Sequence, residues 1–407
     1  MRKFVAVAAL VTGATALVAC SDQSQNPTAL PLAPPSLQVS AVKFWETGAS
    51  VGWNAIERGL LVKHRFGDPI AGFRQFAYLS LAQYNAVIAA ENGQDSGTHP
   101  SERAAVAGAS AAMLTSFFPD EKAYLDGQVT AQQDGEHWPG ESQTDFASGE
   151  AVGRAVAAQV IASAATDRFN DPWTGTIPVC PGCWHSNAPG LPPAHPQLGL
   201  MRPFFLTAGD QFRPAPPPAF GSAEFLAALA EIRHFADTRT HEQDSIAKYW
   251  VFPAGTSLVP GFWNSTASDY IVRFRQDERT AAHTLALMNM AAMDGLIASH
   301  DAKFFYWLIR PSQADPGIAL AIAVPNFPSY PSNHATVSTT AARILESIFP
   351  SQTDRLAALA DEAGESRLYG GIHYRFDKTA GETLARQVAS LALQLDVTGH
   401  EAYALKP

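Results

Sequence analysis

Apolar residues recur at intervals of three and four along most of this 407-residue chain, and that helical spacing restricts the fold more than any other feature. Within residues 44–90 it predicts two amphipathic helices, separated by a break at Gly67, Asp68 and Pro69. Further segments are alanine-rich or helically spaced and show little strand character. These segments are residues 104–118, 146–166, 222–238, 242–250, 266–299, 335–349, 353–368 and 379–395. The chain is therefore predicted to be mainly α.

Residues 167–218 interrupt the helical pattern. Proline, glycine, tryptophan and histidine are dense there, and so many prolines exclude a long helix. A connection of this length is usually a functional loop or a disordered one, and its aromatic residues favour an ordered loop. Two interpretations stay open: a lid over a site, or an irregular surface loop between helical halves. The expected architecture is a helical bundle with long irregular Pro-rich loops.

Composition excludes several classes of protein. With 46% hydrophobic and 16% charged residues the chain is too apolar for a disordered protein, and it lacks the long apolar runs of a polytopic membrane protein. The formal net charge of −10 argues against a nucleic-acid partner, because duplex binding needs a basic face. Any pocket for an anion must therefore be local.

The first residues are typical of an export signal. A basic start precedes an apolar stretch, residues 4–19, that is too short for a membrane span. The tetrapeptide Leu-Val-Ala-Cys that ends at Cys20 resembles a bacterial lipoprotein box, with an ordinary secretory signal as the alternative. The protein is therefore expected in the bacterial cell envelope, lipid-anchored through Cys20 on the periplasmic side or at the outer membrane. The predicted divisions are a signal peptide at residues 1–19, a tether at 20–40 and a single helical domain at 41–407.

Cys180 and Cys183 lie three residues apart in the Pro-rich segment. In an exported protein this spacing favours a local disulfide. A thioredoxin-like redox pair is the alternative, but no βαβ pattern surrounds it. A zinc site that includes His185 lacks a second ligand cluster nearby.

Three short motifs between Lys303 and Asp377 concentrate cationic and histidine side chains. In the first, Arg310 follows Lys303 by seven residues, close to two helical turns, so the two side chains are expected to point the same way. Pro311 biases Arg310 out of the helical region and leaves its guanidinium free to reach a pocket. Alternatively, the lysine is a solvated helix residue and the arginine caps a helix end.

The second motif is Pro331-Ser332-Asn333-His334, at the predicted start of a helix. Backbone N–H groups at a helix start, together with the Ser332 hydroxyl, form a natural cradle for an oxyanion. His334 is placed to exchange protons with the bound ligand. Alternatively, Ser332 or Asn333 is a plain helix cap and His334 a surface residue.

The third motif contains Arg367, His373 and Asp377. If helical, His373 and Asp377 share a face, and the carboxylate holds one ring nitrogen while the other stays free and more basic. Gly370 and Gly371 allow the backbone to approach a ligand closely. Alternatively, the pair lies on the surface beside a helix end.

The three motifs in this order resemble the signature shared by type 2 phosphatidic acid phosphatases, bacterial acid phosphatases and vanadium-dependent haloperoxidases. One position departs from it, because the usual glycine of Pro-Ser-Gly-His is Asn333 here. Flanking residues at 52–54, 249–250, 260–264 and 291–294 are similar to bacterial haloperoxidase-like members. The resemblance implies a helical-bundle haloperoxidase-like fold from about Trp45 to about Leu395.

The resemblance also implies roles for individual residues. His373, oriented by Asp377, would be the apical residue, and His334 the general acid/base. With phosphate, His373 would attack phosphorus while His334 protonates the leaving alkoxide. With vanadate as cofactor, His373 would be the ligand of vanadium, whose Lewis acidity activates hydrogen peroxide toward halide. The implied oxyanion-binding residues are Lys303, Arg310, Ser332, Asn333, Arg367 and His373.

Two further residues favour the haloperoxidase branch. Phe327 stands where the resemblance places an aromatic ring on the halide side, and Glu242 where it places a carboxylate that supports His334. Core packing and a helix-start acid are the alternatives. The leading hypothesis is a vanadate-dependent haloperoxidase acting on hydrogen peroxide and a halide. The alternatives are an acid phosphatase acting on phosphate monoesters, and a non-catalytic oxyanion-binding lipoprotein, which would not need both His334 and the His373–Asp377 pair.

Overall fold

A computed structural model describes residues 47–94, 99–135, 143–397 and 401–406. Within these ranges the regular structure is helical and there is no strand, so the mainly α prediction is confirmed. The α-helices are α2 (Ala49–Lys63), α3 (Pro69–Gln94), α4 (Glu102–Phe117), α5 (Lys122–Gly135), α6 (Gln143–Ala164), α7 (Ala223–Thr238), α8 (His241–Tyr249), α9 (Leu258–Arg273), α10 (Glu278–Tyr306), α11 (Pro311–Ala314), α12 (Asn333–Ile348), α13 (Thr353–Tyr369) and α14 (Arg375–Gln394). The predicted signal peptide, Cys20 and tether lie outside the described residues.

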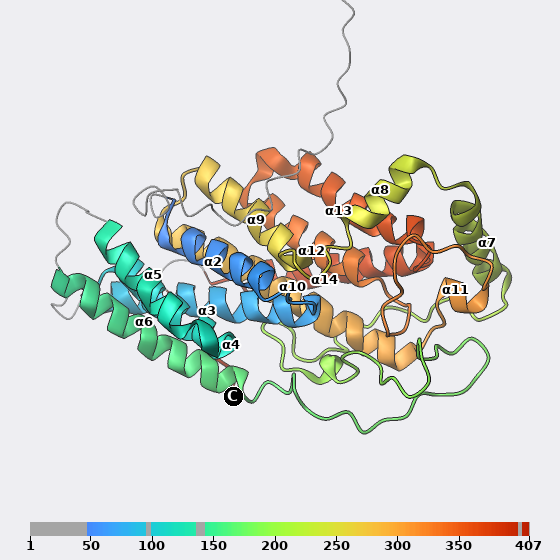
Figure 1. The fold of residues 1–407 in the computed structure, drawn as a ribbon, viewed down its shortest axis with the longest axis horizontal. Coiled ribbons are helices and arrows are strands. Elements are labelled where there is room, and N and C mark those ends of the chain that lie inside the picture. The colour runs from blue at the N-terminus through green and yellow to red at the C-terminus, as the bar shows by residue number, and fades with distance from the viewer. Residues whose placement is uncertain (1–46, 95–98, 136–142, 398–400, 407) are drawn as a thin grey trace, which may run out of the picture. The chain divides into compact units, whose positions relative to one another are not determined.

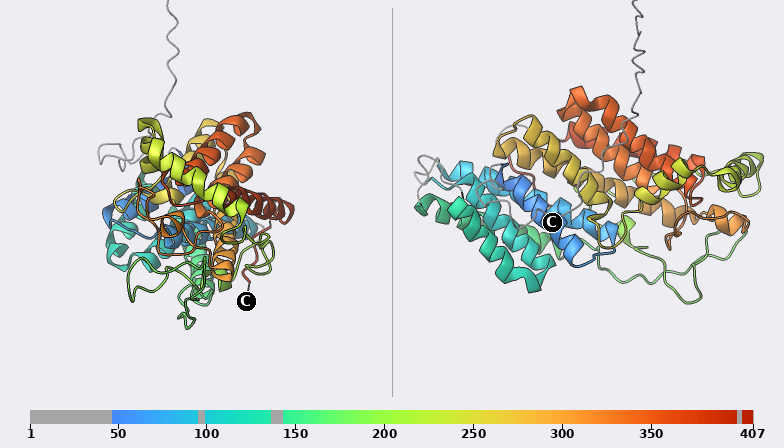
Figure 2. Two further views of the ribbon diagram at one scale, coloured as in Figure 1. Left: turned by 90° about the vertical axis from the view of Figure 1, so that its right-hand side faces the viewer. Right: turned by 45° about the horizontal axis from the view of Figure 1, so that its top comes forward.

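Helix α10 is the central element of the bundle. It packs on α3, α9, α12 and α14 and is buried along most of its length (Figure 1). Helices α12, α13 and α14 pack on one another on one side of it, as the red ribbons in Figure 2 show. Searched for apolar stretches, the described helices include none that is long and apolar enough to cross a membrane.

Small residues allow α4 and α6 to pack at very short range. A Cβ atom on Gly153 would lie 1.9 Å from the carbonyl oxygen of Ala105, and one on Gly108 would lie 2.2 Å from that of Glu150. These backbone contacts require glycine, and the alanines around them keep the interface thin. The alanine-rich composition therefore serves close helix packing as well as helix propensity.

The prediction of a single helix over residues 266–299 is wrong. The chain forms α9 and α10 instead, with a turn between them in which Arg275 has a φ of 52°. Asp277 caps α10 by accepting a hydrogen bond from the Thr280 N–H. Because the turn contains neither glycine nor proline, its sequence carries no obvious break signal. Helix α5 was also not predicted.

The segment between α6 and α7 is irregular, as predicted, apart from one 3₁₀ turn at Leu198–Leu200. It is anchored to α10 by Asp294, whose carboxylate accepts hydrogen bonds from the backbone N–H groups of Phe204, Phe205 and Leu206 at 2.7, 2.7 and 2.9 Å. Arg213 adds a bidentate ion pair with Asp301 on the same helix. The segment is therefore an ordered loop held along α10.

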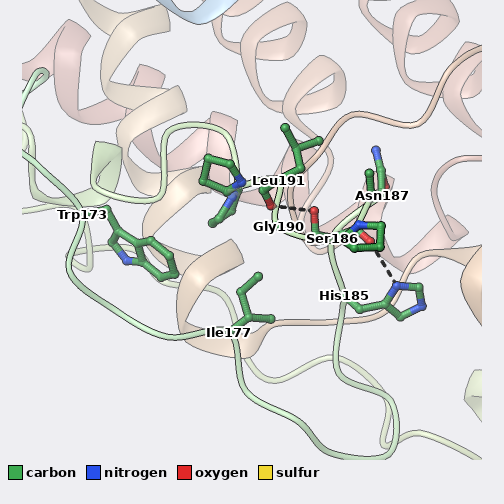
Figure 3. A pocket seen from close by; sticks show the side chains of 11 residues that line it. Trp173, Ile177, His185, Ser186, Asn187, Gly190 and Leu191 are labelled. Atoms are coloured by element: carbon green, nitrogen blue, oxygen red, sulfur yellow. Dashed lines mark hydrogen bonds between the residues drawn. The ribbon is translucent and has the colours of Figure 1, made fainter.

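Part of this loop lines an open cavity of about 590 Å³ between Trp173 and Ile177 on one side and residues 185–193 on the other (Figure 3). The Ser186 hydroxyl donates to the Leu191 carbonyl across the turn. No residue of the three motifs between Lys303 and Asp377 lines this cavity, so it is separate from the candidate site described below.

Cys180 and Cys183 form a disulfide in the same loop. The disulfide turn pairs with the backbone that leads from α10 to Arg310. The Ile309 N–H donates to the Gly182 carbonyl at 3.0 Å, and the Trp184 N–H donates to the Trp307 carbonyl at 2.6 Å. The cysteine pair thus braces the segment that carries one of the predicted cations.

Candidate active site

Lys303 lies near the end of α10 and is completely buried. Its ammonium group donates to three backbone carbonyls of the loop before α12, those of Pro328 at 3.0 Å, Ser329 at 2.9 Å and Pro331. All three N–H donors are therefore engaged with protein. Burial and the charge of Arg310 lower the pKa of Lys303 well below its usual value, but three carbonyl acceptors require the ammonium form. In this arrangement Lys303 supplies positive charge to the site rather than a free hydrogen bond.

Arg310 does not share a helix with Lys303, so the expectation of two helical turns between them is wrong. Helix α10 ends at Tyr306, and Trp307 takes a left-handed conformation with φ 52° that turns the chain. The two side chains nevertheless converge, because the Lys303 ammonium and the Arg310 guanidinium lie 5.1 and 5.2 Å from the ring centre of Phe327. Arg310 itself is extended (φ −77°, ψ 153°), as expected for a residue before proline.

The guanidinium of Arg310 is fully buried and incompletely satisfied. Its Nε donates to the Phe327 carbonyl at 3.0 Å, and its Nη1 donates to the Ile372 carbonyl at 2.7 Å and to Nε2 of His373 at 3.0 Å. Its Nη2 has no partner. A buried guanidinium with an unused donor is suited to an oxyanion ligand.

Ser332 caps α12, its hydroxyl accepting from the Ala335 N–H, and Asn333 is the first helical residue. The Asn333 side chain points into the core, where its Oδ1 accepts from the Ser299 hydroxyl at 2.7 Å and its Nδ2 donates to Nε2 of His300 at 3.0 Å. The asparagine at the usual glycine position is therefore held by residues of α10.

Replacing Asn333 with glycine is expected to lower the free energy of unfolding by about 1–3 kcal/mol, because Ser299 and His300 lose buried partners. Urea denaturation measures this. Asn333→Ala serves as the control, since it removes the same hydrogen bonds but keeps a β-carbon at the helix start. Affinity for inorganic phosphate should stay within about threefold, because the backbone N–H is kept. A much larger loss of affinity would show that the asparagine side chain itself holds the ligand.

His334, on the first turn of α12, donates from Nε2 to the Trp250 carbonyl at 2.9 Å. Burial and the charge of Arg367 lower its pKa well below the usual value, so the ring is neutral at neutral pH. Its Nδ1 is then the proton acceptor. Glu242, the expected support of His334, lies exposed at the start of α8 and has no contact with it among the described hydrogen bonds; the Trp250 carbonyl occupies that role.

His373 and Asp377 form the expected pair, with 2.8 Å between Nδ1 and Oδ2. His373 precedes α14 rather than lying on it. Asp377 sits in the first turn and also accepts from the Tyr374 N–H at 3.0 Å and the Ser329 hydroxyl at 2.5 Å. The carboxylate thus fixes the imidazole with its Nδ1 proton toward Asp377 and its Nε2 lone pair toward Arg310.

Burial raises the pKa of Asp377 to about 6. The carboxylate is therefore ionised at neutral pH and becomes protonated as the pH falls through about 6, which removes an acceptor of the His373 Nδ1–H. Turnover is expected to fall on the acid side of that pH. A pH–rate profile checks this. Asp377→Asn should turn over much more slowly, and its rate should no longer fall as the pH drops through about 6. An unchanged limb in that variant would assign the titration to another group.

Arg367 on α13 completes the set of buried cations. Its Nε donates to the Ser366 hydroxyl and its Nη2 donates to the Ala247 carbonyl, both at 2.9 Å. Burial lowers the pKa of Arg367 to about 9 and that of Arg310 to about 10, yet both stay charged at neutral pH. Burial and the neighbouring cations, Arg310 first, lower the pKa of His373. The site combines neutral histidines with fixed positive charge, which attracts an anion.

A cavity of about 460 Å³ opens onto the histidines. Of the predicted residues, Phe327, Asn333, His334 and His373 line it. Lys303, Arg310, Arg367 and Ser332 are not among its lining residues, although Arg310 contacts His373, which is. The other wall includes the start of α3 and two residues of the long loop, Ala194 and His195. The loop therefore borders the site, and its role as a lid stays a prediction.

Sequence reasoning missed His300, Ser329 and Trp250. His300 is completely buried on α10, and its Nδ1 contacts the His195 carbonyl at 3.2 Å. Its place three residues before Lys303, on the same helical face, was a usable signal. Ser329 reaches the site through tertiary packing and had no such signal, and Trp250 stood out only through the flanking similarity at residues 249–250.

The site thus brings buried cations and two histidines, one of them paired with a carboxylate, to one place in a helical fold. Comparisons with known proteins show where such a fold occurs. A family model described as the second helical-bundle domain of VCPO matches residues 349–398. The chain is 30% identical over 178 residues to a non-specific acid phosphatase of Providencia stuartii, covering 42% of this chain and 68% of that enzyme. It is 33% identical over 101 residues to one of Salmonella typhi, covering 23% of this chain and 40% of that enzyme.

Solved structures share the fold. A bacterial vanadium-dependent iodoperoxidase matches with a TM-score of 0.70 at 23% identity, covering 86% of this chain and 96% of that one. A bacterial vanadium-dependent chloroperoxidase matches with a TM-score of 0.67 at 15% identity, covering 80% of this chain and 91% of that one. The chain belongs to the superfamily of type 2 phosphatidic acid phosphatases, acid phosphatases and vanadium-dependent haloperoxidases.

Proposed function

We propose that the protein is a vanadate-dependent haloperoxidase that uses hydrogen peroxide to oxidise a halide. The observation that carries this proposal is the state of His334. The ring is neutral, its Nε2–H is held by the Trp250 carbonyl, and it lines a cavity of mainly apolar residues. A neutral imidazole accepts a proton from hydrogen peroxide more readily than it donates one to a leaving alkoxide.

The chain's donors fit vanadate. Arg310 has an unpartnered buried Nη2, and the Nε2 lone pair of His373 is fixed by the Nδ1 contact with Asp377. Bound vanadate would supply Lewis acidity toward peroxide. Asp377 keeps the proton on Nδ1 of His373 in place. His334 accepts and returns a proton at its own Nδ1. The residues that would hold vanadate are Arg310, Arg367, Ser332, Asn333 and His373, with Lys303 as a nearby charge.

An acid phosphatase is the second candidate, favoured by the sequence similarity to non-specific acid phosphatases. The same residues would hold a phosphate monoester, with His373 as nucleophile and His334 as proton donor. A purely oxyanion-binding protein is disfavoured, because binding alone needs neither the His373–Asp377 pair nor a buried neutral His334.

One experiment separates the candidates. The purified protein is assayed with and without orthovanadate for peroxide-dependent oxidation of iodide, bromide and chloride, and for hydrolysis of 4-nitrophenyl phosphate. Halide oxidation that depends on vanadate supports the proposal. Hydrolysis that vanadate inhibits, without halide oxidation, favours the phosphatase. If the protein binds phosphate but shows neither activity, the result supports a non-catalytic oxyanion-binding protein.

We further propose that the enzyme is exported and anchored to the bacterial envelope through lipidated Cys20. Membrane fractionation of cells that express the wild type or Cys20→Ala tests this. A variant that stays in the membrane fraction contradicts the anchor.

A further inference from the structure

A second histidine–aspartate pair lies in the wall of the same cavity. His195 of the long loop donates from Nε2 to Oδ2 of Asp68 at 2.8 Å, and both residues line the cavity with His334 and His373. His195 adopts a left-handed backbone conformation with φ 50°, and its ring packs 5.2 Å from Phe169. None of the three motifs accounts for this pair.

Asp68 is a positioning residue. It caps α3, with Oδ1 accepting from the backbone N–H groups of Ile70 at 3.0 Å and Ala71 at 3.2 Å. Burial raises the pKa of Asp68, but the hydrogen bond and charge of His195, together with these N–H groups, lower it overall. The Asp68 carboxylate is therefore ionised, and both of its oxygens already accept hydrogen bonds. Nε2 of His195 is engaged as well, so Nδ1 is the ring atom left for a ligand.

The cavity around this pair is apolar. Two aromatic rings, Phe73 and Phe327, line it together with Ile70, Val259, Leu296 and Val337. No lysine or arginine lines it, and its one carboxylate is that of Asp68, among the residues that the structure describes. The remaining polar lining residues are His334, His373, Asn326 and Asn333, so most of the wall around the His195–Asp68 pair is apolar. Such a wall suits a neutral aromatic ligand that carries one hydroxyl group.

The dyad is also linked to the oxyanion site. The His195 carbonyl accepts from Nδ1 of His300 at 3.2 Å, and Nε2 of His300 accepts from Nδ2 of Asn333 at 3.0 Å. Asn333 stands between Ser332 and His334. A ligand beside His195 therefore lies in the same cavity as His334 and His373, the histidines proposed to act on the oxyanion.

The geometry points to His195, oriented by Asp68, as the proton acceptor for a phenolic substrate bound in this cavity. The inference deepens the proposed function and rests on it, because the hypohalous acid that it needs is the product of the proposed halide oxidation. Nδ1 of His195 takes the phenolic proton. A carbon of the phenolate ring forms its bond to halogen as the halogen–oxygen bond of hypohalous acid breaks. The hydroxide that leaves takes the proton from His195 and departs as water, and the hydrogen on the halogenated carbon moves to oxygen, restoring the phenol.

Binding of 4-nitrophenol tests the site without any turnover. In a buffer acidic enough to keep the free compound neutral, wild-type protein is titrated with 4-nitrophenol while saturating inorganic phosphate fills the oxyanion pocket. A saturable phenolate absorption band is expected. His195→Asn, which tolerates the left-handed backbone, and Asp68→Asn, which preserves the helix cap, should each lose most of that band. Binding of 4-nitroanisole, which has no proton to give, should stay within about threefold in Asp68→Asn.

His185→Asn is the matched control, since His185 lies on the same loop but lines the separate cavity of Figure 3. Thermal denaturation checks that each variant is folded. No saturable band in the wild type, an equal band in folded His195→Asn, or a band that phosphate abolishes overturns the inference. A normal band without any halide oxidation contradicts the proposed function instead. In the halogenation of a phenol, His195→Asn should lower the rate by about 10²-fold.

Discussion

Replacing His373 with alanine is expected to lower turnover by about 10³-fold or more, whichever of the two chemistries the enzyme performs. Nε2 of His373 is the apical atom in both proposed mechanisms, and the Asp377 contact at Nδ1 orients its lone pair. The variant should still fold. Asp377 keeps its bonds from Ser329 and the Tyr374 N–H, and Nη1 of Arg310 keeps the Ile372 carbonyl. Steady-state kinetics and thermal denaturation measure the two effects.

The chain offers a matched control for this variant. His283 on α10 forms another histidine–aspartate pair, with 2.8 Å between Nε2 and Oδ1 of Asp396, but it does not line the site cavity. His283→Ala removes a comparable histidine–carboxylate hydrogen bond and should keep turnover near the wild-type value. Undiminished turnover in folded His373→Ala would overturn the assigned mechanism.

Asp294→Asn is expected to lower the free energy of unfolding by about 3–5 kcal/mol. The carboxylate is completely buried and accepts three backbone N–H groups of the long loop. An amide directs an NH₂ group at part of this set, so at least one loop donor loses its acceptor and faces another donor. The loop also supplies His195 to the cavity wall, so activity should fall together with stability. Urea denaturation and limited proteolysis of the loop measure the change.

Asp301→Asn provides the comparison. Asp301 lies on the same helix and binds the same loop through Arg213, but this pair is partly exposed. Its loss should cost about 1 kcal/mol or less. Equal effects in the two variants would show that the loop is held by its packing as a whole rather than by the buried carboxylate.

The helices could largely be predicted from sequence, because their apolar spacing is local information. The same reasoning failed where a turn lacks glycine and proline. Arg275 and Trp307 both take left-handed conformations, and these two turns end α9 and α10. The first divides a predicted helix, and the second invalidates the helical argument for Lys303 and Arg310, although their side chains still meet at Phe327.

The candidate site could be predicted where its residues are close in sequence. His373 and Asp377 are four residues apart, and their contact follows from that spacing. The Trp250 carbonyl at His334 and the His195 carbonyl at His300 come from segments 84 and 105 residues away. Only the packing of α8 and of the long loop brings them there, so the sequence predicts Glu242 rather than the Trp250 carbonyl as the partner of His334.

The three carbonyl contacts of Lys303 have a consequence for ligand selection. A flexible ammonium group in water would have to be desolvated and ordered when each anion arrives. Here the charge is already dehydrated and fixed, so the pocket is electrostatically preorganised and needs little reorganisation as charge changes during a reaction. Discrimination between one tetrahedral anion and another must then come from the arginine donors and from the shape of the histidine wall.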